Sequence, residues 1–76
     1  MSRLVLYSRE VAGQDWKVYR DFDDFYEDVS RGHMTTMAMG RKVKEHRRGA
    51  QESNPTWQFG LGTKNHKPVG FDDLDA

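Results

Sequence analysis

Large apolar residues between positions 22 and 29 recur with the spacing of one helix face. They stand at i, i+3, i+4 and i+7, and they are Phe22, Phe25, Tyr26 and Val29. Carboxylates fill most of the other positions, so one side of such a helix is apolar and the rest is acidic. Asp21 can cap the free amides at its start, and Gly32 can end it. The pattern predicts a short amphipathic helix that needs an apolar surface to pack against.

Two β-prone segments precede this helix. The run LVLY is short and apolar, and WKVYR places apolar residues at mostly even spacing. The segment EVAGQD between them contains two turn residues, Gly13 and Asp15. We therefore expect residues 3–9 and 16–20 to form an antiparallel hairpin.

The segment 34–48 fits two kinds of element. Met39 and Val43 share a helix face, but they also share one face of a strand. One of the two threonines of MTTM can cap a helix, and Gly49 can end it. Because the segment is long for a strand, we predict a helix.

A loop and a third strand are predicted next. The stretch GAQESNPT has loop composition, and Pro55 restricts the residue before it to extended conformations. Beyond it, Trp57, Phe59 and Leu61 alternate with a glutamine and two glycines, which is typical of a half-buried strand. Glycines inside a strand mark bulges or close backbone approach.

These elements combine into one small α+β domain. A chain of 76 residues has material for a single core, because it buries only about 60% of its surface on folding. We predict a small antiparallel sheet, made of the N-terminal hairpin and a C-terminal strand, packed against two helices in the order ββααβ. The domain spans residues 1–76. Residues 64–76 form either a flexible tail or a segment held to the body by its three apolar residues, Val69, Phe71 and Leu74.

The absence of cysteine and the composition of the first residues indicate the cellular compartment that we expect for this chain. The sequence has no cysteine, so neither a disulfide framework nor a zinc-thiolate site is available. The first ten residues contain an apolar run of only four, too short for a signal peptide or a membrane span. We expect a soluble, cytoplasmic protein without a membrane partner.

Opposite charges are concentrated in two neighbouring segments. Twelve acidic and twelve basic residues cancel, but residues 21–30 carry −5 and residues 31–48 carry +5. The balanced total argues against a general affinity for polyanions. The candidate partner-binding residues are the acids Asp23, Asp24, Glu27 and Asp28 and the cations Arg41, Lys42, Lys44, Arg47 and Arg48.

The acids on the predicted helix allow more than one use. Carboxylate pairs can act as general acid and base or hold a hard cation, but both uses need a cleft that fixes their geometry. The stretch also lacks the spacing and central glycine of an EF-hand loop. We expect a solvated helix face or a surface that docks on a basic protein groove, in preference to a metal site.

The basic segment 41–48 has a second interpretation. A row of cations can follow phosphates, and Trp57 or Phe59 could stack on bases beside it. The two rings, however, are also needed to cover the sheet. We favour a solvated helix end or a site for an acidic protein, because the domain is neutral and the acidic helix could lie close enough to repel a duplex. The three methionines of MTTMAM fit either the core, which we favour, or an adaptable docking surface.

No catalytic constellation is visible in the sequence. The three histidines lie 13 and 20 residues apart, without the short pair spacing of zinc sites. No serine occupies a nucleophile-elbow context, and GLGTKNHKPVG matches neither phosphate-binding glycine pattern. We expect neither enzymatic activity nor a cofactor or metal.

The functional expectation is a small non-catalytic binding protein. It would dock on a macromolecular partner, in the first place a protein, through its charged surfaces and modulate or inhibit that partner. In size and layout the chain is similar to the compact regulators that phages and mobile elements encode. The alternative is a nucleic-acid-binding module that uses segment 41–48. A homodimer would add apolar burial to a small core.

Overall fold

The computed structural model describes residues 3–68, which form three strands and two helices. In chain order they are β1 (Leu4–Arg9), β2 (Lys17–Asp21), α1 (Asp23–Ser30), α2 (Thr36–Ser53) and β3 (Gln58–Thr63). The strands form one antiparallel sheet in the order β2-β1-β3. The predicted α+β fold and its order ββααβ are confirmed, and both hairpin strands lie within one residue of their predicted positions.

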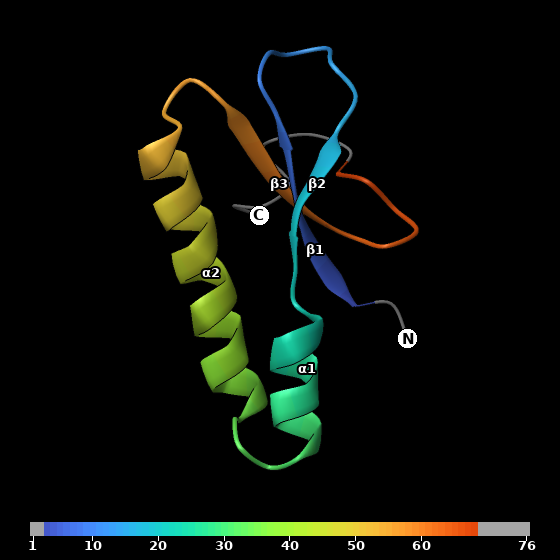
Figure 1. The fold of residues 1–76 in the computed structure, drawn as a ribbon, viewed down its shortest axis with the longest axis vertical. Coiled ribbons are helices and arrows are strands. Elements are labelled where there is room, and N and C mark those ends of the chain that lie inside the picture. Colours follow the sequence, from blue (N-terminus) through green and yellow to red (C-terminus); the bar gives the residue numbers. More distant parts are fainter. Residues whose placement is uncertain (1–2, 69–76) are drawn as a thin grey trace.

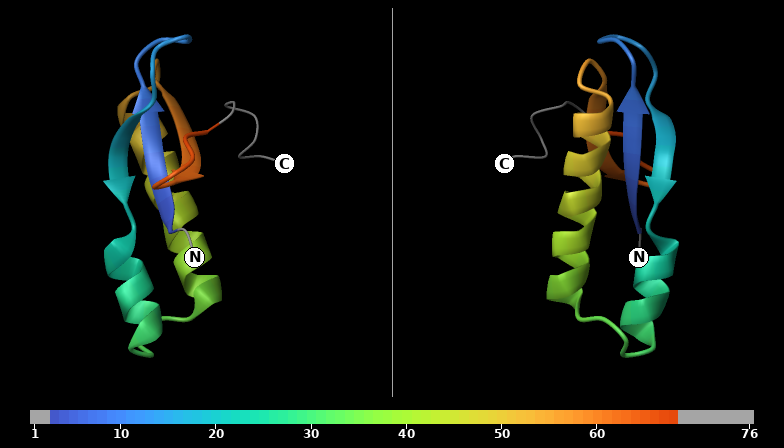
Figure 2. Two further views of the ribbon diagram at one scale, coloured as in Figure 1. Left: turned by 90° about the vertical axis from the view of Figure 1, so that its right-hand side faces the viewer. Right: turned by 60° about the vertical axis from the view of Figure 1, so that its left-hand side comes forward.

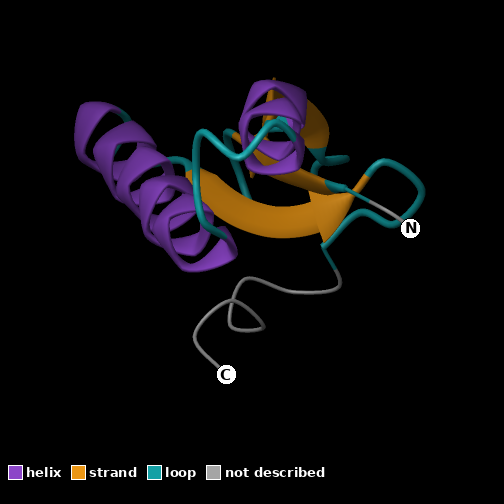
Figure 3. Cartoon of the chain, turned by 90° about the horizontal axis from the view of Figure 1, so that it is seen from below, coloured by secondary structure: helices purple, strands orange, loops and turns teal. Residues whose placement is uncertain are grey.

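The two helices make the molecule longer than its sheet. α1 continues beyond the end of β2, and α2 runs back beside α1 and then along the sheet (Figure 1). Two further views show α2 following one face of the sheet (Figure 2), and from below both helices lie on that side (Figure 3).

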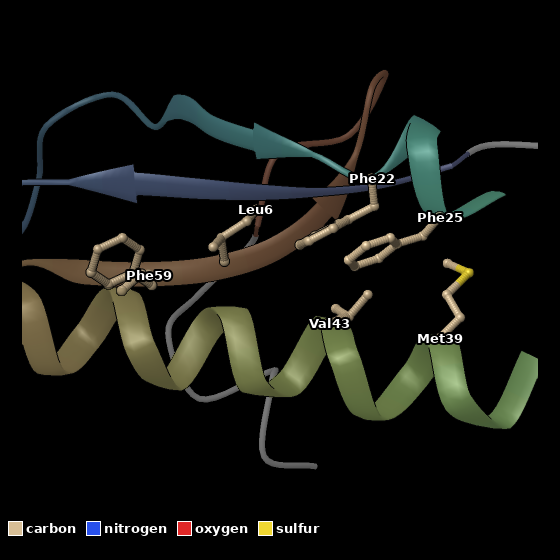
Figure 4. Close-up of a cluster of buried hydrophobic side chains, with 7 residues drawn as sticks. Leu6, Phe22, Phe25, Met39, Val43 and Phe59 are labelled. Carbon is tan, nitrogen blue, oxygen red and sulfur yellow. The ribbon is translucent and has the colours of Figure 1, made fainter. Parts of the chain in front are cut away.

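The main core lies between this face of the sheet and the helices. Its buried members are Leu6, Phe22, Phe25, Met39, Val43, Ala50 and Phe59, six of which are labelled in Figure 4. Tyr26 and Val29 are partly buried against them. The apolar face predicted for residues 22–29 is therefore confirmed, and it supplies the contact between α1 and the rest of the fold.

A β-bulge decides which face each residue of β2 occupies. Leu6 pairs with Arg20 while Tyr7 pairs with Val18, so Tyr19 is an extra residue in the ladder. A bulge shifts the alternation of side chains along its strand. Consequently Trp16 belongs to a second cluster, whereas Phe22 reaches the main core. The even spacing in the sequence identified the strand but not this change of face.

The second cluster lies on the opposite face of the sheet and contains Val5, Tyr7 and Trp16. The chain that follows β3 covers it. The Tyr7 hydroxyl donates a hydrogen bond to the Thr63 carbonyl, and Pro68 is buried. Because β1 is covered on both faces, its apolar run is almost continuous.

The glycines of β3 permit this covering segment to approach. A Cβ on Gly60 would lie 2.6 Å from Cγ of Pro68, and one on Gly62 would lie 2.4 Å from the carbonyl oxygen of His66. Of the two roles predicted for these glycines, close approach is therefore the correct one. Residues 69–76, with the predicted contacts of Val69, Phe71 and Leu74, lie outside the described residues.

α2 extends further than its sequence predicts. The helix over 34–48 is confirmed, and Thr35 caps it by accepting a hydrogen bond from the Ala38 amide at 3.0 Å. The prediction that Gly49 ends it is wrong, as is the loop assigned to 49–53. Ala50 is buried in the main core, and this packing outweighs the weak helix propensity of glycine.

Side-chain and backbone hydrogen bonds define the two ends of α1. The Asp23 amide donates to Oδ1 of Asp21 at 3.3 Å, although Phe22 occupies the capping position. At the other end Gly32 has a φ of +78°. The His33 amide donates to the Asp28 carbonyl at 2.8 Å, as in a Schellman motif. The predicted stop at Gly32 is confirmed. The predicted cap is not, because Phe22 is the N-cap and Asp21 binds only the first amide of the helix.

Candidate partner-binding surfaces

Two of the four predicted acids are already bound within the molecule. Oδ2 of Asp23 accepts a hydrogen bond from Lys64 Nζ at 2.7 Å, and its Oδ1 lies 3.6 Å from Arg3 Nη1. Asp24 Oδ2 accepts a hydrogen bond from Arg20 Nη2 at 3.0 Å. These pairs neutralise half of the predicted acidic surface.

The pKa of Asp23 reflects this pairing. It is lowered from its ordinary value of 3.8, chiefly by the hydrogen bond from Lys64. Desolvation, the next largest effect, raises it, and the positive charges of Lys64 and Arg3 lower it further. Asp23 thereby joins α1 to the chain that follows β3. Its carboxylate has a structural use, and a partner would have to displace Lys64 to reach it.

Arg20 connects Asp24 to two rings of the main core. The Arg20 guanidinium lies 4.9 Å from the ring centre of Phe22 and 4.8 Å from that of Phe25. Such cation–π contacts hold the arginine in place while its head group pairs with Asp24. The pair therefore shields two buried rings and is less available to another molecule than its exposure suggests.

Glu27 and Asp28 are the remaining acids of the predicted surface. Glu27 is exposed and Asp28 is half-buried, and neither forms an ion pair with any residue of the described range. Across residues 3–68 no three His, Cys, Asp or Glu side chains are arranged to hold a metal ion. The usable acidic surface on α1 is therefore smaller than the sequence predicts.

The predicted basic residues divide around α2. Each residue turns a helix by about 100°, so Arg41, Lys44 and Arg48, at i, i+3 and i+7, share one side. Lys42 is rotated toward one flank and Arg47 toward the other, where Arg47 is half-buried. We call Arg41, Lys44 and Arg48 the basic stripe.

The basic stripe is fully available to solvent. All three residues are exposed, and within residues 3–68 none of them forms an ion pair with an acid. The acids of α1 pair instead with Arg3, Arg20 and Lys64. Glu45 and Glu52 are exposed on the same side of α2, but neither lies within ion-pair distance of the three cations, which are therefore unpaired among the described residues.

An apolar seam separates the two charged surfaces. Phe25 of α1 faces Met39 and Val43 of α2 (Figure 4). The ring of His46 continues the seam, with its centre 5.5 Å from that of Phe25. The acids and cations therefore lie on the outer sides of their own helices, and the structure does not bring them into one site.

The aromatic residues proposed for base stacking are occupied by the core. Phe59 is fully buried. Trp57 is half-buried, and its ring stacks on that of Phe59 with centres 6.2 Å apart and planes inclined by 23°. Phe59 has no free face for a nucleobase, so the interpretation of this ring as a stacking platform is wrong.

The methionines that precede the basic stripe have different environments. Met39 is buried and Met34 is partly buried against the core. Met37, in contrast, exposes 76% of its surface. The sequence favours the core for these three residues. The structure places Met34 and Met39 there but leaves Met37 at the surface.

One shallow depression lies between β2 and α2. It has a volume of about 300 Å³ and is lined by Tyr19, His46, Gly49, Ala50 and Ser53. Only Tyr19 and His46 of this lining are titratable, and none of the nine predicted site residues contributes to it. A second shallow depression, of about 270 Å³, is lined by Ala38, Arg41, Lys42 and Glu45, so two of the predicted cations border a hollow on the surface of α2.

Comparison with known proteins gives no relative: the chain matches no family model, no curated protein and no solved structure. Neither helix of residues 3–68 has the length and apolar character needed to cross a membrane.

Proposed function

We propose that this chain is a non-catalytic binding protein that docks on an acidic surface of a protein partner through Arg41, Lys44 and Arg48, and modulates that partner. One observation carries the proposal. These three cations share an exposed side of α2 and have no ion-pair partner among residues 3–68. An acidic partner can neutralise them without breaking an internal contact.

The alternative use of the acidic helix requires more rearrangement. A basic partner would compete with Lys64 for Asp23 and with Arg20 for Asp24. Only Glu27 and Asp28 would then be free for it among the predicted acids. The basic stripe is therefore the better candidate of the two surfaces.

The expected energetics fit a role in association. An exposed ion pair contributes about 0.2–1 kcal/mol, so three pairs cannot supply high affinity alone. Charge complementarity instead raises the association rate and discriminates against wrong partners. Screening by salt weakens such contacts, which gives the proposal a directly measurable property.

The test is affinity capture with a charge-matched control. The immobilised full chain is incubated with native lysate at low salt, with and without nuclease. The stripe variant is Arg41→Glu/Lys44→Glu/Arg48→Glu, and the control is Lys17→Glu/Arg31→Glu/Lys67→Glu. The control reverses three other exposed cations, so both variants have the same net charge.

We expect the wild type and the control to retain the same acidic protein, and the stripe variant to lose it. Retention by the stripe variant would contradict the proposal. Capture that nuclease abolishes would favour nucleic acid instead. For duplex DNA, contacts by three permanent cations give a slope of log affinity against log salt of about −2.7, which an oligonucleotide titration measures.

A further inference from the structure

An exposed apolar residue extends the basic stripe by one turn. Met37 precedes Arg41 by four positions, so the series 37, 41, 44, 48 has the spacing 4, 3, 4 along one side of α2. At 1.5 Å per residue the row is about 16 Å long. Met37 exposes 76% of its surface, more than Val11, Val18 or Tyr19.

The position of Met37 is not explained by the packing of the fold. Met34 and Met39, from the same segment, contribute to the core while Met37 points away from it. A methionine side chain is flexible and polarisable, so it adapts to irregular partner surfaces. An apolar side chain that becomes buried also adds affinity that exposed ion pairs lack.

We propose that the partner segment recognised by this surface is an acidic amphipathic helix, with carboxylates opposite Arg41, Lys44 and Arg48 and an apolar residue covering Met37. This inference rests on the proposed function, because it assigns the chemistry of the partner to the same stripe. Two features of the row support it. The row has three cations with one apolar residue at its end, and its spacing matches that of a second helix.

The geometry favours a helix over an extended segment. Arg41 and Arg48 are separated by about 10.5 Å along the axis of α2, with Lys44 between them. A second helix repeats the same spacing of 3 and 4 residues, and two helices that cross at about 20° stay in contact over several turns. Alternate residues of a strand advance by about 6.7 Å, so three of them span about 13 Å and fall out of step with the row.

The probes are synthetic peptides that are cross-linked to hold them helical. The matched peptides carry one leucine and three glutamates with the 4, 3, 4 spacing, in both chain orders. A second set has the same composition with the glutamates spread around the helix. A third set replaces the leucine of the matched peptides by serine. Each is titrated into the ¹⁵N-labelled full chain at about 50 mM salt, where ionic contacts are weakly screened.

Substitutions in the protein separate the apolar contact from the charges. Met37→Ser removes the exposed side chain, and Val18→Ser is the matched control, since Val18 is also exposed but belongs to β2. Both positions are at the surface, so neither change should unfold the chain. Backbone amide shifts that remain dispersed confirm this in the same spectra.

We expect at least one matched peptide to bind on the order of tenfold more tightly than its spread counterpart, which corresponds to about 1.4 kcal/mol. The shifted amides should lie within residues 37–48. Met37→Ser should lower the affinity for that peptide to that of the serine version, and Val18→Ser should not. Together these results would establish the acidic helix with its apolar anchor.

Other results overturn the inference. Equal binding of matched and spread peptides would show that the partner need not be a helix. Binding that Met37→Ser leaves unchanged would show that Met37 is not an apolar contact. Either result overturns the inference but not the proposed docking through the basic stripe. If a duplex oligonucleotide shifts the same amides at a lower concentration than the peptides, the partner of this surface is a nucleic acid and not an acidic helix. If no peptide binds and stripe reversal leaves affinity capture unchanged, the inference and the proposed function both fail.

Discussion

At the scale of single residues, Asp23 connects three distant parts of the chain. It begins α1, accepts a hydrogen bond from Lys64 at 2.7 Å and lies 3.6 Å from Arg3. Lys64 lies 41 positions from Asp23 in the sequence. Its role is therefore structural, although its sequence context is that of a surface acid.

The lowered pKa of Asp23 makes its contribution depend on pH. A carboxyl whose pKa is lower in the folded than in the unfolded state stabilises the fold above the unfolded pKa, and this stabilisation is lost as pH falls through the folded pKa. We expect Asp23→Asn to lower the urea midpoint at pH 7, and the difference from wild type to shrink below pH 3.8, the ordinary value for this group.

Glu27→Gln is the control for this measurement, because Glu27 is an exposed acid of the same helix without an ion pair among residues 3–68. It should change the urea midpoint little at either pH. A difference between wild type and Asp23→Asn that is constant from pH 7 to pH 3 would exclude the proposed role of the ion pairs.

Gly62 is required by the segment that covers the second face of the sheet. A Cβ at this position would lie 2.4 Å from the His66 carbonyl oxygen, a backbone atom that cannot move independently. We expect Gly62→Ala to destabilise the fold by about 1–3 kcal/mol, the usual cost of overpacking. Chemical denaturation measures this change, and a loss below about 0.3 kcal/mol would show that residues 64–68 do not pack here as described.

At the scale of elements, α2 is longer than sequence signals indicate because its last turn is held by the loop that precedes β3 and by the core. The Gln51 side chain donates to the Trp57 carbonyl at 2.8 Å, and the Asn54 amide donates to the Ala50 carbonyl at 3.0 Å. These contacts and the burial of Ala50 continue the helix past Gly49. Such contacts between elements are not encoded in local propensity.

Gly49 is accordingly an unfavourable residue in a helix interior. A Cβ built on it meets no atom within 4 Å, and its φ is not positive. We expect Gly49→Ala to stabilise the fold by about 0.5–1 kcal/mol, because alanine loses less backbone entropy on folding. Thermal or urea unfolding measures the gain.

Gly32→Ala provides the opposite control, since Gly32 also has open space around it but adopts a φ of +78°. That substitution should destabilise the fold by about 1 kcal/mol, the cost of a left-handed conformation for a residue with a Cβ. If Gly49→Ala destabilised the protein to a similar extent, α2 would have to end at Gly49 as its sequence suggests.

The elements differ in how far the sequence predicts them. The apolar face of α1 was predictable because its four large apolar residues stand at i, i+3, i+4 and i+7, the spacing of one helix face. Gly32 then provides a standard stop. The β2 bulge was not, because Tyr19 carries no signal that it is an extra residue. Periodicity reports local geometry, whereas the bulge depends on how two strands pair.

The candidate surfaces follow the same rule. Local composition identified the cations of α2, and helical geometry then separates the basic stripe from Lys42 and Arg47. Asp23 and Lys64 are far apart in the sequence and meet only in the folded chain. The sequence therefore predicts more unpaired acids on α1 than the structure has. Met37 could be assigned to the surface only once α2 was oriented against the core.

At the scale of the whole molecule, the packing of the core and the proposed binding use different sides of the same two helices. Their inner sides form the apolar seam of Phe25, Met39 and Val43. Their outer sides carry charge, and on α1 much of it is compensated by Arg3, Arg20 and Lys64. This arrangement leaves α2 as the element through which a small domain can contact a partner without unfolding any part of its core.

The central claim is that the basic stripe, and not net charge in general, recognises an acidic partner. The direct measurement is the association rate of the captured protein with wild type, the stripe variant and the charge-matched control, followed across salt concentration. We predict that reversing Arg41, Lys44 and Arg48 lowers this rate by at least about tenfold at low salt and that the control stays within about threefold of wild type. Equal rates for the two variants would contradict the claim.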